Sequence, residues 1–478
     1  MSEVNTTSGR SPSVSDAPSG RPGLRTVITV VAIAGLLLSA VAAPFAQAPT
    51  LWGLVPIVLF CALALLGMDI VVATVVAVIS ALLLMLPSPA EAGSLLGDSL
   101  GDDITVIGLV IMLGAGVGEV LRTTGIAATI VQGVMRVVRN RGRGAATLGV
   151  MVSCLILVAS LGTLAGALAI AAPLLLPIVA RLGFTRSATA SMMFIGGGAG
   201  LALAPFVGSN LAIMDAAEVG YLQYLLYGGG PVAALSLVAG LVIVPWMQRR
   251  TQHTDDYYDT AELGATDDGR GPRSGVATAA FGVALIGSLV YAVISEAGIT
   301  FPLFALPTLG IVAGLAGGLS PTKIASTMYT GAARLIHVFL LFWLLAMLFA
   351  GIDALKPFQV ILATYGHDLQ GLSPFAFALV IAVLGWVGVP GATAAQVVLL
   401  DKVFGALAAS VGIPAGGWVV VLLFASKADT YGPFPNPNMI SAMSLARSES
   451  LKNIFYTGLL VLVPACTMYA IILFFVTR

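Results

Sequence analysis

The stretch "SKADTYGPFPNPNM" (residues 426–439) lies between two long apolar runs near the end of the chain. It holds three prolines, two asparagines, a lysine and an aspartate. Proline disrupts a helix because it lacks an amide N–H and its ring clashes with the preceding turn. Inside a membrane, the backbone groups that such a break releases need new partners. We therefore predict a broken membrane helix over residues 413–440.

The composition of the whole chain sets the class of protein. Hydrophobic residues make up 58% of the 478 residues and charged residues only 9%, whereas a soluble domain has roughly 25% charged residues. Apolar runs that are long enough to cross a bilayer as helices recur throughout. The chain is therefore predicted to be an all-α polytopic protein of the cytoplasmic membrane.

The same composition argues against several other functions. The formal net charge is zero, so no basic surface suggests binding to nucleic acid. The three cysteines have no CxxC spacing and the three histidines are scattered, so neither a metal nor another cofactor is expected. The sequence has no Walker loop and no HExxH motif, so we expect neither an ATP-driven pump nor an enzyme.

The apolar runs divide the chain into two similar halves. Residues 1–26 are rich in Ser, Gly and Pro and are predicted to form a disordered cytoplasmic tail. Two transport repeats, 51–248 and 274–478, are predicted on either side of a polar cytoplasmic linker at 249–273. An extra transmembrane helix at 27–46 precedes them, because its long apolar run and polar flank do not fit a cleaved signal peptide. The predicted spans, about 11 in number, are 27–46, 51–67, 69–86, 104–122, 187–215, 222–247, 275–295, 300–319, 335–356, 413–440 and 454–476.

Each half also has an apolar stretch that is too long for one span and too short for two. Residues 145–180, with "SLGTLAG" at the middle, and residues 373–409, with "GVPGAT", predict two re-entrant hairpins. The motifs "PFVGSNL" (205–211) and "PFPNPNM" (433–439) match at Pro, Phe and Asn with an offset of 228 residues. Inverted-topology repeats with paired broken helices are typical of secondary transporters.

The positive charges support this topology. With the N-terminus in the cytoplasm, nearly all Lys and Arg residues fall on the cytoplasmic side, as the positive-inside rule requires. The two hairpins would then open to opposite sides of the membrane. The exceptions to the rule are Lys356, Lys402, Lys427 and Arg478.

Two further stretches carry a family likeness. They are "GLVIMLGAGVGEVLRTTGIAATIVQGVM" (108–135) and "GGGPVAALSLVAG" (228–240). With these stretches and the paired hairpins and breaks, the chain resembles the ion transporter superfamily, most closely its gluconate permease family of organic-acid:proton symporters. The likeness covers residues 51–478 and implies a homodimer. Sodium-coupled dicarboxylate members of the superfamily carry Ser-Asn-Thr at both hairpin tips. The tips here read Leu-Gly-Thr-Leu (161–164) and Pro-Gly-Ala-Thr (390–393), which favours proton coupling.

The hairpin tips and the residues after the breaks supply a candidate binding site. Helix ends at a break present free N–H groups to an anion and free carbonyls to a cation. Threonine hydroxyls could donate to a carboxylate or polyol, and asparagine offers both a donor and an acceptor. The alternative is that these side chains bond their own backbone and cap the resumed half-helices. The candidate substrate-binding residues are Gly162, Thr163, Ser209, Asn210, Gly391, Thr393, Lys427, Asn436 and Asn438.

The second break also contains two charged residues that the first break lacks. The offset of 228 residues places Ala199 and Leu201 opposite Lys427 and Asp429. Ionisable residues inside a membrane usually mark an ion or substrate pathway. Asp429 is predicted to carry the coupling proton, and Lys427 to attract a carboxylate or to pair with Asp429. The alternative is a structural ion pair or an interfacial lysine.

Together these features predict a secondary transporter that moves a small organic anion by proton symport with alternating access. A sugar acid or a hydroxy-carboxylate is the expected substrate. The alternatives are a sodium/proton antiporter and a sodium-coupled carboxylate symporter. An intramembrane enzyme acting on lipid-linked substrates is a further alternative, but the duplicated and mostly neutral Gly/Pro breaks argue against it.

Overall fold

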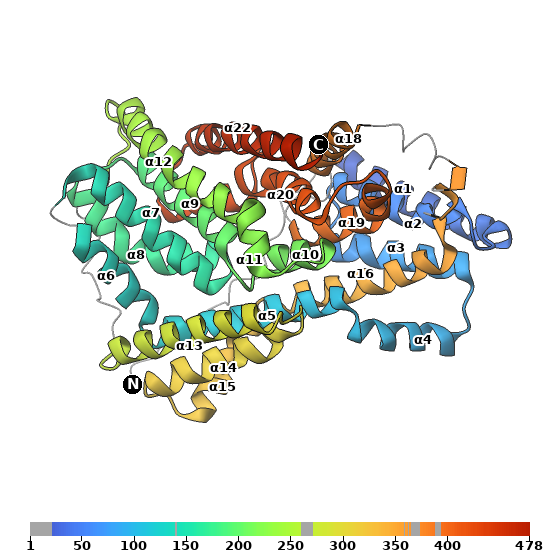
Figure 1. Cartoon of the computed structure of the whole chain (residues 1–478), viewed down its shortest axis with the longest axis horizontal. Coiled ribbons are helices and arrows are strands. Elements are labelled where there is room, and N and C mark those ends of the chain that lie inside the picture. Colours follow the sequence, from blue (N-terminus) through green and yellow to red (C-terminus); the bar gives the residue numbers. More distant parts are fainter. Residues whose placement is uncertain are drawn as a thin grey trace, which may run out of the picture.

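The computed structural model describes residues 22–138, 141–259, 271–357, 359–361, 363–364, 373–387 and 393–478. Every regular element in these ranges is a helix (Figure 1). The first half contains α1 (Pro22–Ala42), α2 (Val55–Leu65), α3 (Ile70–Met85), α4 (Pro89–Asp98), α5 (Asp103–Thr123), α6 (Ile126–Val138), α7 (Gly142–Leu161), α8 (Leu164–Arg181), α9 (Arg186–Leu203), α10 (Gly208–Ala216), α11 (Tyr221–Tyr224) and α12 (Gly230–Thr251). The second half contains α13 (Ser274–Ile294), α14 (Phe301–Ala316), α15 (Pro321–Ala333), α16 (Ile336–Leu355), α18 (Pro374–Leu384), α19 (Thr393–Ser410), α20 (Ala415–Tyr431), α21 (Pro437–Leu445) and α22 (Leu451–Val476).

The outer surface of these helices is strongly apolar. Ten helices in the described part of the chain are long and apolar enough to cross a membrane. Large apolar side chains point outward, among them Val283 and Ile294 of α13 and Phe475 of α22. Apolar surface of this extent is unfavourable in water and suits contact with lipid tails. The predicted all-α polytopic membrane fold is therefore confirmed.

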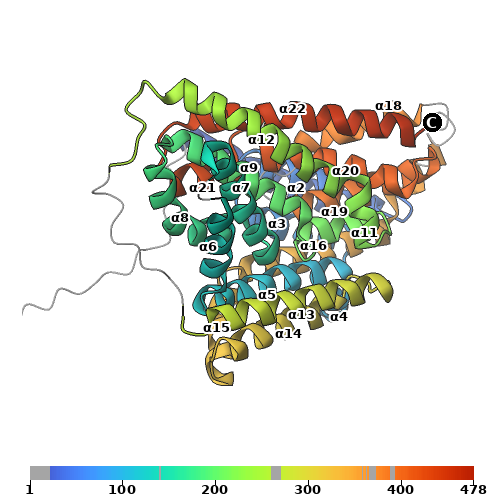
Figure 2. The same cartoon turned by 60° about the vertical axis from the view of Figure 1, so that its left-hand side comes forward.

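The helices pack into two groups that lie beside each other (Figures 1 and 2). A scaffold group consists of α1–α5 and α13–α16. A hairpin group consists of α7–α12 and α18–α22 and contains both hairpins and both broken helices. In Figure 2, α5, α13 and α14 lie along the lower edge and α12 and α22 along the upper edge. α6 packs against members of both groups, and α10 packs against α5 of the scaffold.

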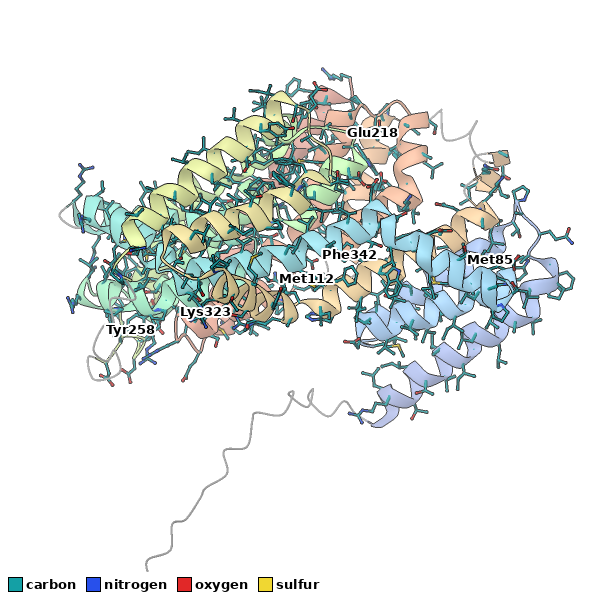
Figure 3. All side chains as sticks on the ribbon, turned by 90° about the horizontal axis from the view of Figure 1, so that it is seen from below. Met85, Met112, Glu218, Tyr258, Lys323 and Phe342 are labelled. Atoms are coloured by element: carbon teal, nitrogen blue, oxygen red, sulfur yellow. The ribbon has the colours of Figure 1, made fainter. Side chains whose placement is uncertain are left out.

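Residues assigned to opposite sides of the membrane lie at opposite ends of the molecule. Figure 3 places Tyr258 and Lys323 toward one end and Met85 and Glu218 toward the other. The predicted topology puts the first two residues in cytoplasmic segments and the last two in external ones. The side of the membrane on which each segment lies stays a prediction.

Each half of the chain contains a hairpin and a broken helix, as predicted. In the first half, α7 and α8 form a hairpin that turns at Gly162 (φ 73°), and α9 and α10 form the broken helix. In the second half, α18 and α19 are the arms of the hairpin, and α20 and α21 form the broken helix. α10 packs against α19, and α21 packs against α8. Each resumed half-helix thus packs on the return arm of the other half's hairpin, as expected for two intertwined repeats.

The first hairpin is longer than a shallow loop. Its arms α7 and α8 have 20 and 18 residues, so each is long enough to be a span in its own right. The tip nevertheless lies beside the first break, because a Cβ added at Gly162 would lie 3.7 Å from Val207 Cγ2. The hairpin therefore ends beside the broken helix.

Three helices, α4, α6 and α15, have no counterpart in the sequence prediction, and two of them, α4 and α15, have local caps. α4 begins with a capping box, in which Ser88 N donates to Glu91 Oε2 at 2.7 Å. α15 follows Ser320, whose Oγ accepts from Lys323 N at 3.3 Å. Both helices are short and start from local caps. A search for long apolar runs therefore passes over them.

The linker is more ordered than its composition indicates. α12 continues to Thr251, and part of the segment 252–259 contacts the ends of α9 and α21. Asp256 O accepts from Arg186 N at 2.7 Å, and Tyr258 Oη donates to Ala446 O at 2.8 Å. This segment is held by hydrogen bonds to helix ends. It therefore has no apolar periodicity from which its structure could be predicted.

Candidate functional site

The second break follows directly from its prolines. α20 ends at Tyr431, and Gly432 adopts φ 104°, a left-handed conformation that glycine tolerates. Pro433 and Pro435 contribute no N–H, so the chain cannot close another helical turn. The helix resumes as α21 when Asn436 Oδ1 accepts from Met439 N at 2.9 Å. The break thus leaves a short non-helical segment between two half-helices.

Asp429 in the last turn of α20 is where the second hairpin and the second break meet. Thr393 Oγ1, at the start of α19, donates to Asp429 Oδ2 at 3.1 Å. Asn438 Nδ2 of α21 donates to the carbonyl oxygen of Asp429 at 3.0 Å. The Asp429 side chain is 7% exposed. The structure therefore brings together three of the residues singled out from the sequence.

Asn436 offers an unused donor beside this cluster. Its Oδ1 caps α21, but its Nδ2 is buried and has no hydrogen-bond partner among the described residues. A buried polar group without a partner costs about 1–3 kcal/mol. Such a donor suits an acceptor oxygen that arrives with a solute or a water molecule.

Lys427 does not belong to the same cluster. It is 5% exposed and makes no hydrogen bond or ion pair with any described residue. Residues two positions apart in a helix do not share a face, so Lys427 and Asp429 point in different directions. Leu423 and Tyr431, one turn away on the face of Lys427, contact Gly228 and α12. Among the described residues, the structure therefore shows no ion pair between Lys427 and Asp429.

At the first break, Asn210 occupies the position that Asn438 has at the second. Asn210 Nδ2 donates to the carbonyl oxygens of Leu201 and Ala204, each at 2.8 Å. Ser209 Oγ lies 3.5 Å from Asn210 Oδ1, at the outer limit of a hydrogen bond. The asparagine thus bonds carbonyls at the end of α9 and does not cap the resumed half-helix α10.

Two tyrosines that the sequence prediction passed over complete the first break. Tyr221 Oη donates to Leu203 O at 2.6 Å, and Tyr224 Oη donates to Ala202 O at 2.9 Å. Their rings stack with centroids 6.4 Å apart. The one available signal was a pair of tyrosines spaced i, i+3 a few residues after the broken helix, and this signal is weak.

The two hairpin tips differ in what the structure places there. Thr163 stands at the start of α8 without a side-chain capping bond. Thr393, its counterpart at the second tip, bonds to Asp429 as described above. Gly391 lies outside the described residues. The first tip therefore contributes a hydroxyl that makes no capping bond, and the second a hydroxyl bonded to the acid.

Three charged side chains are buried in the described ranges, namely Glu119, Lys427 and Asp429. Glu119 of α5 is held by Arg122 and by Arg334, whose Nη1 lies 3.0 Å from Glu119 Oε2. Glu119 therefore forms a structural ion-pair cluster in the scaffold group. Asp429 is the buried acid that lies at a helix break, where a bound ion or proton can be exchanged.

Comparison with known proteins places this geometry in context. A model of the Na+/H+ antiporter family matches residues 22–246, which span α1 and most of the predicted first repeat. No curated protein matches the chain. The match does not extend to the second break.

One solved structure with a similar fold is the crystal structure of the YdaH transporter of Alcanivorax borkumensis, which is described as having an unusual topology. The likeness covers 95% of this chain and 99% of that chain, with a TM-score of 0.54 and 14% identity. At this identity the likeness shows a shared fold alone. Neither match is to a gluconate permease, so that resemblance is not confirmed.

Proposed function

We propose that the chain is a secondary active transporter, rather than an enzyme, that exchanges sodium ions for protons at the second break. The observation that carries the proposal is the burial of Asp429 at a break that also receives Thr393 and Asn438. The match of residues 22–246 to the Na+/H+ antiporter family model supports sodium over an organic anion as the main substrate.

The chemistry of exchange follows from the cost of charge in a membrane. A bare carboxylate is expensive to hold at low dielectric, whereas a protonated acid or a sodium carboxylate carries no net charge. Asp429 would therefore cross between the two sides only when it carries either a proton or a sodium ion. Because both compete for the same carboxylate, the site exchanges one for the other.

Alternating access would come from the two helix groups. The hairpin group contains both tips and both breaks, so it can carry the site as a unit against the scaffold group. Such movement between a site-bearing bundle and a fixed bundle is a common way to alternate access. We propose this movement for the present chain.

Exchange can be tested with purified protein in proteoliposomes that contain a pH-sensitive dye. An imposed outward sodium gradient should drive protons inward, and Asp429→Asn should reduce the rate at least tenfold. Asp215→Asn, a matched acid-to-amide change in α10 of the first repeat, should keep the rate within about twofold. Absence of sodium-dependent proton flux in the wild-type protein, or full activity of Asp429→Asn, would refute the proposal.

A second candidate function has an observation of its own. The buried Nδ2 of Asn436 lacks a hydrogen-bond partner among the described residues, and a solute carboxylate or hydroxyl oxygen would supply one. This favours coupled transport of a small organic anion. Uptake of labelled organic acids that depends on a sodium or pH gradient, and that Asn436→Ala reduces, would support this second function over exchange alone.

A further inference from the structure

The two breaks can be compared carbonyl by carbonyl because one hydrogen bond recurs in both. Asn210 Nδ2 donates to Leu201 O at 2.8 Å, and Asn438 Nδ2 donates to Asp429 O at 3.0 Å. Donor and acceptor are nine residues apart in both cases, and both pairs obey the offset of 228 residues. The carbonyls of residues 202–204 therefore correspond to those of residues 430–432.

The first break is closed, in the sense that side chains of the same repeat donate hydrogen bonds to its backbone carbonyls. Asn210 bonds the carbonyls of Leu201 and Ala204, and the hydroxyls of Tyr221 and Tyr224 bond those of Leu203 and Ala202. All four carbonyls at the end of α9 thus accept a side-chain hydrogen bond. Ala202 and Ala204 are fully buried, as is the Tyr224 ring.

The second break has no such closure. The offset places Glu449 and Lys452 where the first repeat has its two tyrosines, so the phenol hydroxyls are missing. In the described part of the chain, no hydrogen-bond donor reaches the carbonyl of Thr430 or of Gly432. The carbonyl of Tyr431 instead lies against Gly458 of α22.

The turn of the second break is also more exposed than the turn of the first. Phe434 is 62% exposed, whereas Val207 and Gly208 in the first break are buried. Gly208 packs directly against Ile107 and Ile111 of α5. Thr430 and Gly432, which carry the open carbonyls, are themselves buried, and the exposed part of the turn begins two residues after Gly432.

From this asymmetry we propose that each chain holds a single coupling-cation site, at the second break. At the first break, side-chain donors occupy the carbonyls and Leu201 stands in place of the acid. The ligands would be the Asp429 carboxylate, the Thr393 hydroxyl and the carbonyls of Thr430 and Gly432. One carboxylate among neutral oxygens balances a monovalent ion, and oxygen ligands suit a hard cation. No group of three or more acidic, His or Cys side chains that would suit a divalent metal occurs among the described residues. This inference rests on the sodium exchange proposed above.

The test is direct binding of radioactive sodium to the purified full chain in detergent. The wild-type protein should bind one sodium ion per chain, and Asp429→Asn should bind none. The double variant Tyr221→Phe/Tyr224→Phe keeps both rings and should still bind one ion with an affinity within about twofold. Asp215→Asn serves as the matched control and should also bind one ion.

Three results would overturn the single-site proposal: two ions per wild-type chain, one ion left in Asp429→Asn, or loss of binding in the double tyrosine variant. Size-exclusion profiles establish that each variant is folded. Sodium-driven proton flux together with two bound ions would refute the single site and leave exchange intact. No sodium binding and no flux in the wild-type protein would refute exchange itself.

Discussion

The hydroxyl of Thr393 donates to Oδ2 of Asp429 at 3.1 Å, which joins the return arm of the second hairpin to the last turn of α20. Both elements belong to the hairpin group, so the bond lies within the part of the molecule that carries the proposed site. We therefore expect proton or ion binding at Asp429 to be coupled to this contact with the hairpin.

Loss of this hydroxyl should shift the pH dependence of exchange. A hydroxyl that donates to a carboxylate stabilises its charged form, so Thr393→Val should let protons compete more strongly with sodium. A bond to a charged group contributes about 1.5–3 kcal/mol, which corresponds to roughly one pH unit or more. The pH of half-maximal exchange in proteoliposomes should rise by that amount. Thr393→Ser, which keeps the donor, should behave like the wild-type protein, and an unchanged profile in Thr393→Val would contradict the coupling.

Removal of Lys427 should leave sodium/proton exchange intact. Lys427 is buried and has no bonded partner among the described residues, so Lys427→Met should be neutral or should raise the melting temperature. Sodium/proton exchange should persist in this variant, because Lys427 lies on a different face of α20 from Asp429. Loss of exchange while the protein stays folded would show that the lysine takes part in transport.

The two equivalent asparagines should differ in their contribution to stability. Asn210 makes two bonds to backbone carbonyls, whereas Asn438 makes one. At about 1 kcal/mol for each bond, Asn210→Ala should lower the free energy of unfolding by about 2 kcal/mol and Asn438→Ala by about half as much. Thermal unfolding in detergent measures which of the two variants loses more stability. Equal melting temperatures for the two variants would count against the closed first break.

Close helix packing in the hairpin group should depend on Gly196 of α9. A side chain at this position would meet the backbone carbonyl of Met151 in α7, which cannot move aside without displacing the helix. Gly196→Ala should therefore destabilise the protein by at least about 2 kcal/mol. Gly133→Ala in α6, where nothing lies nearby, should be neutral or stabilise by up to about 1 kcal/mol. Similar melting temperatures for both variants would be unexpected.

The contacts of Tyr258 should protect residues 252–259 of the linker from proteolysis. Tyr258 Oη bonds Ala446 O at 2.8 Å, and the Tyr258 ring lies under the guanidinium of Arg186. Tyr258→Phe should lose the hydrogen bond, worth about 1 kcal/mol, and retain the ring contact. Limited proteolysis near residues 252–259 should speed up modestly in Tyr258→Phe and strongly in Tyr258→Ala. No change in Tyr258→Ala would mean that these contacts do not hold the linker.

The parts of the fold that depend on local chemistry were predictable. The prolines and Gly432 of the second break act on their own backbone, so the end of α20 and the restart at α21 follow from residues 426–439. The long apolar runs likewise predict most of the spans. The sequence could also have predicted that Lys427 and Asp429 lie on different faces of the helix, because residues two positions apart in a helix are separated by about 200°. Their opposite charges suggested an ion pair instead.

The sequence by itself thus determined an all-helical membrane protein with two broken helices and two hairpins, because these depend on apolar length and on where proline and glycine fall. Only the tertiary structure decided which break is closed. Tyr221 and Tyr224 lie 18 and 22 residues after the carbonyls they bond, and their hydroxyls reach those carbonyls only because the chain folds back on α9. A hydrogen bond over that separation depends on how the helices pack, and no local pattern specifies it.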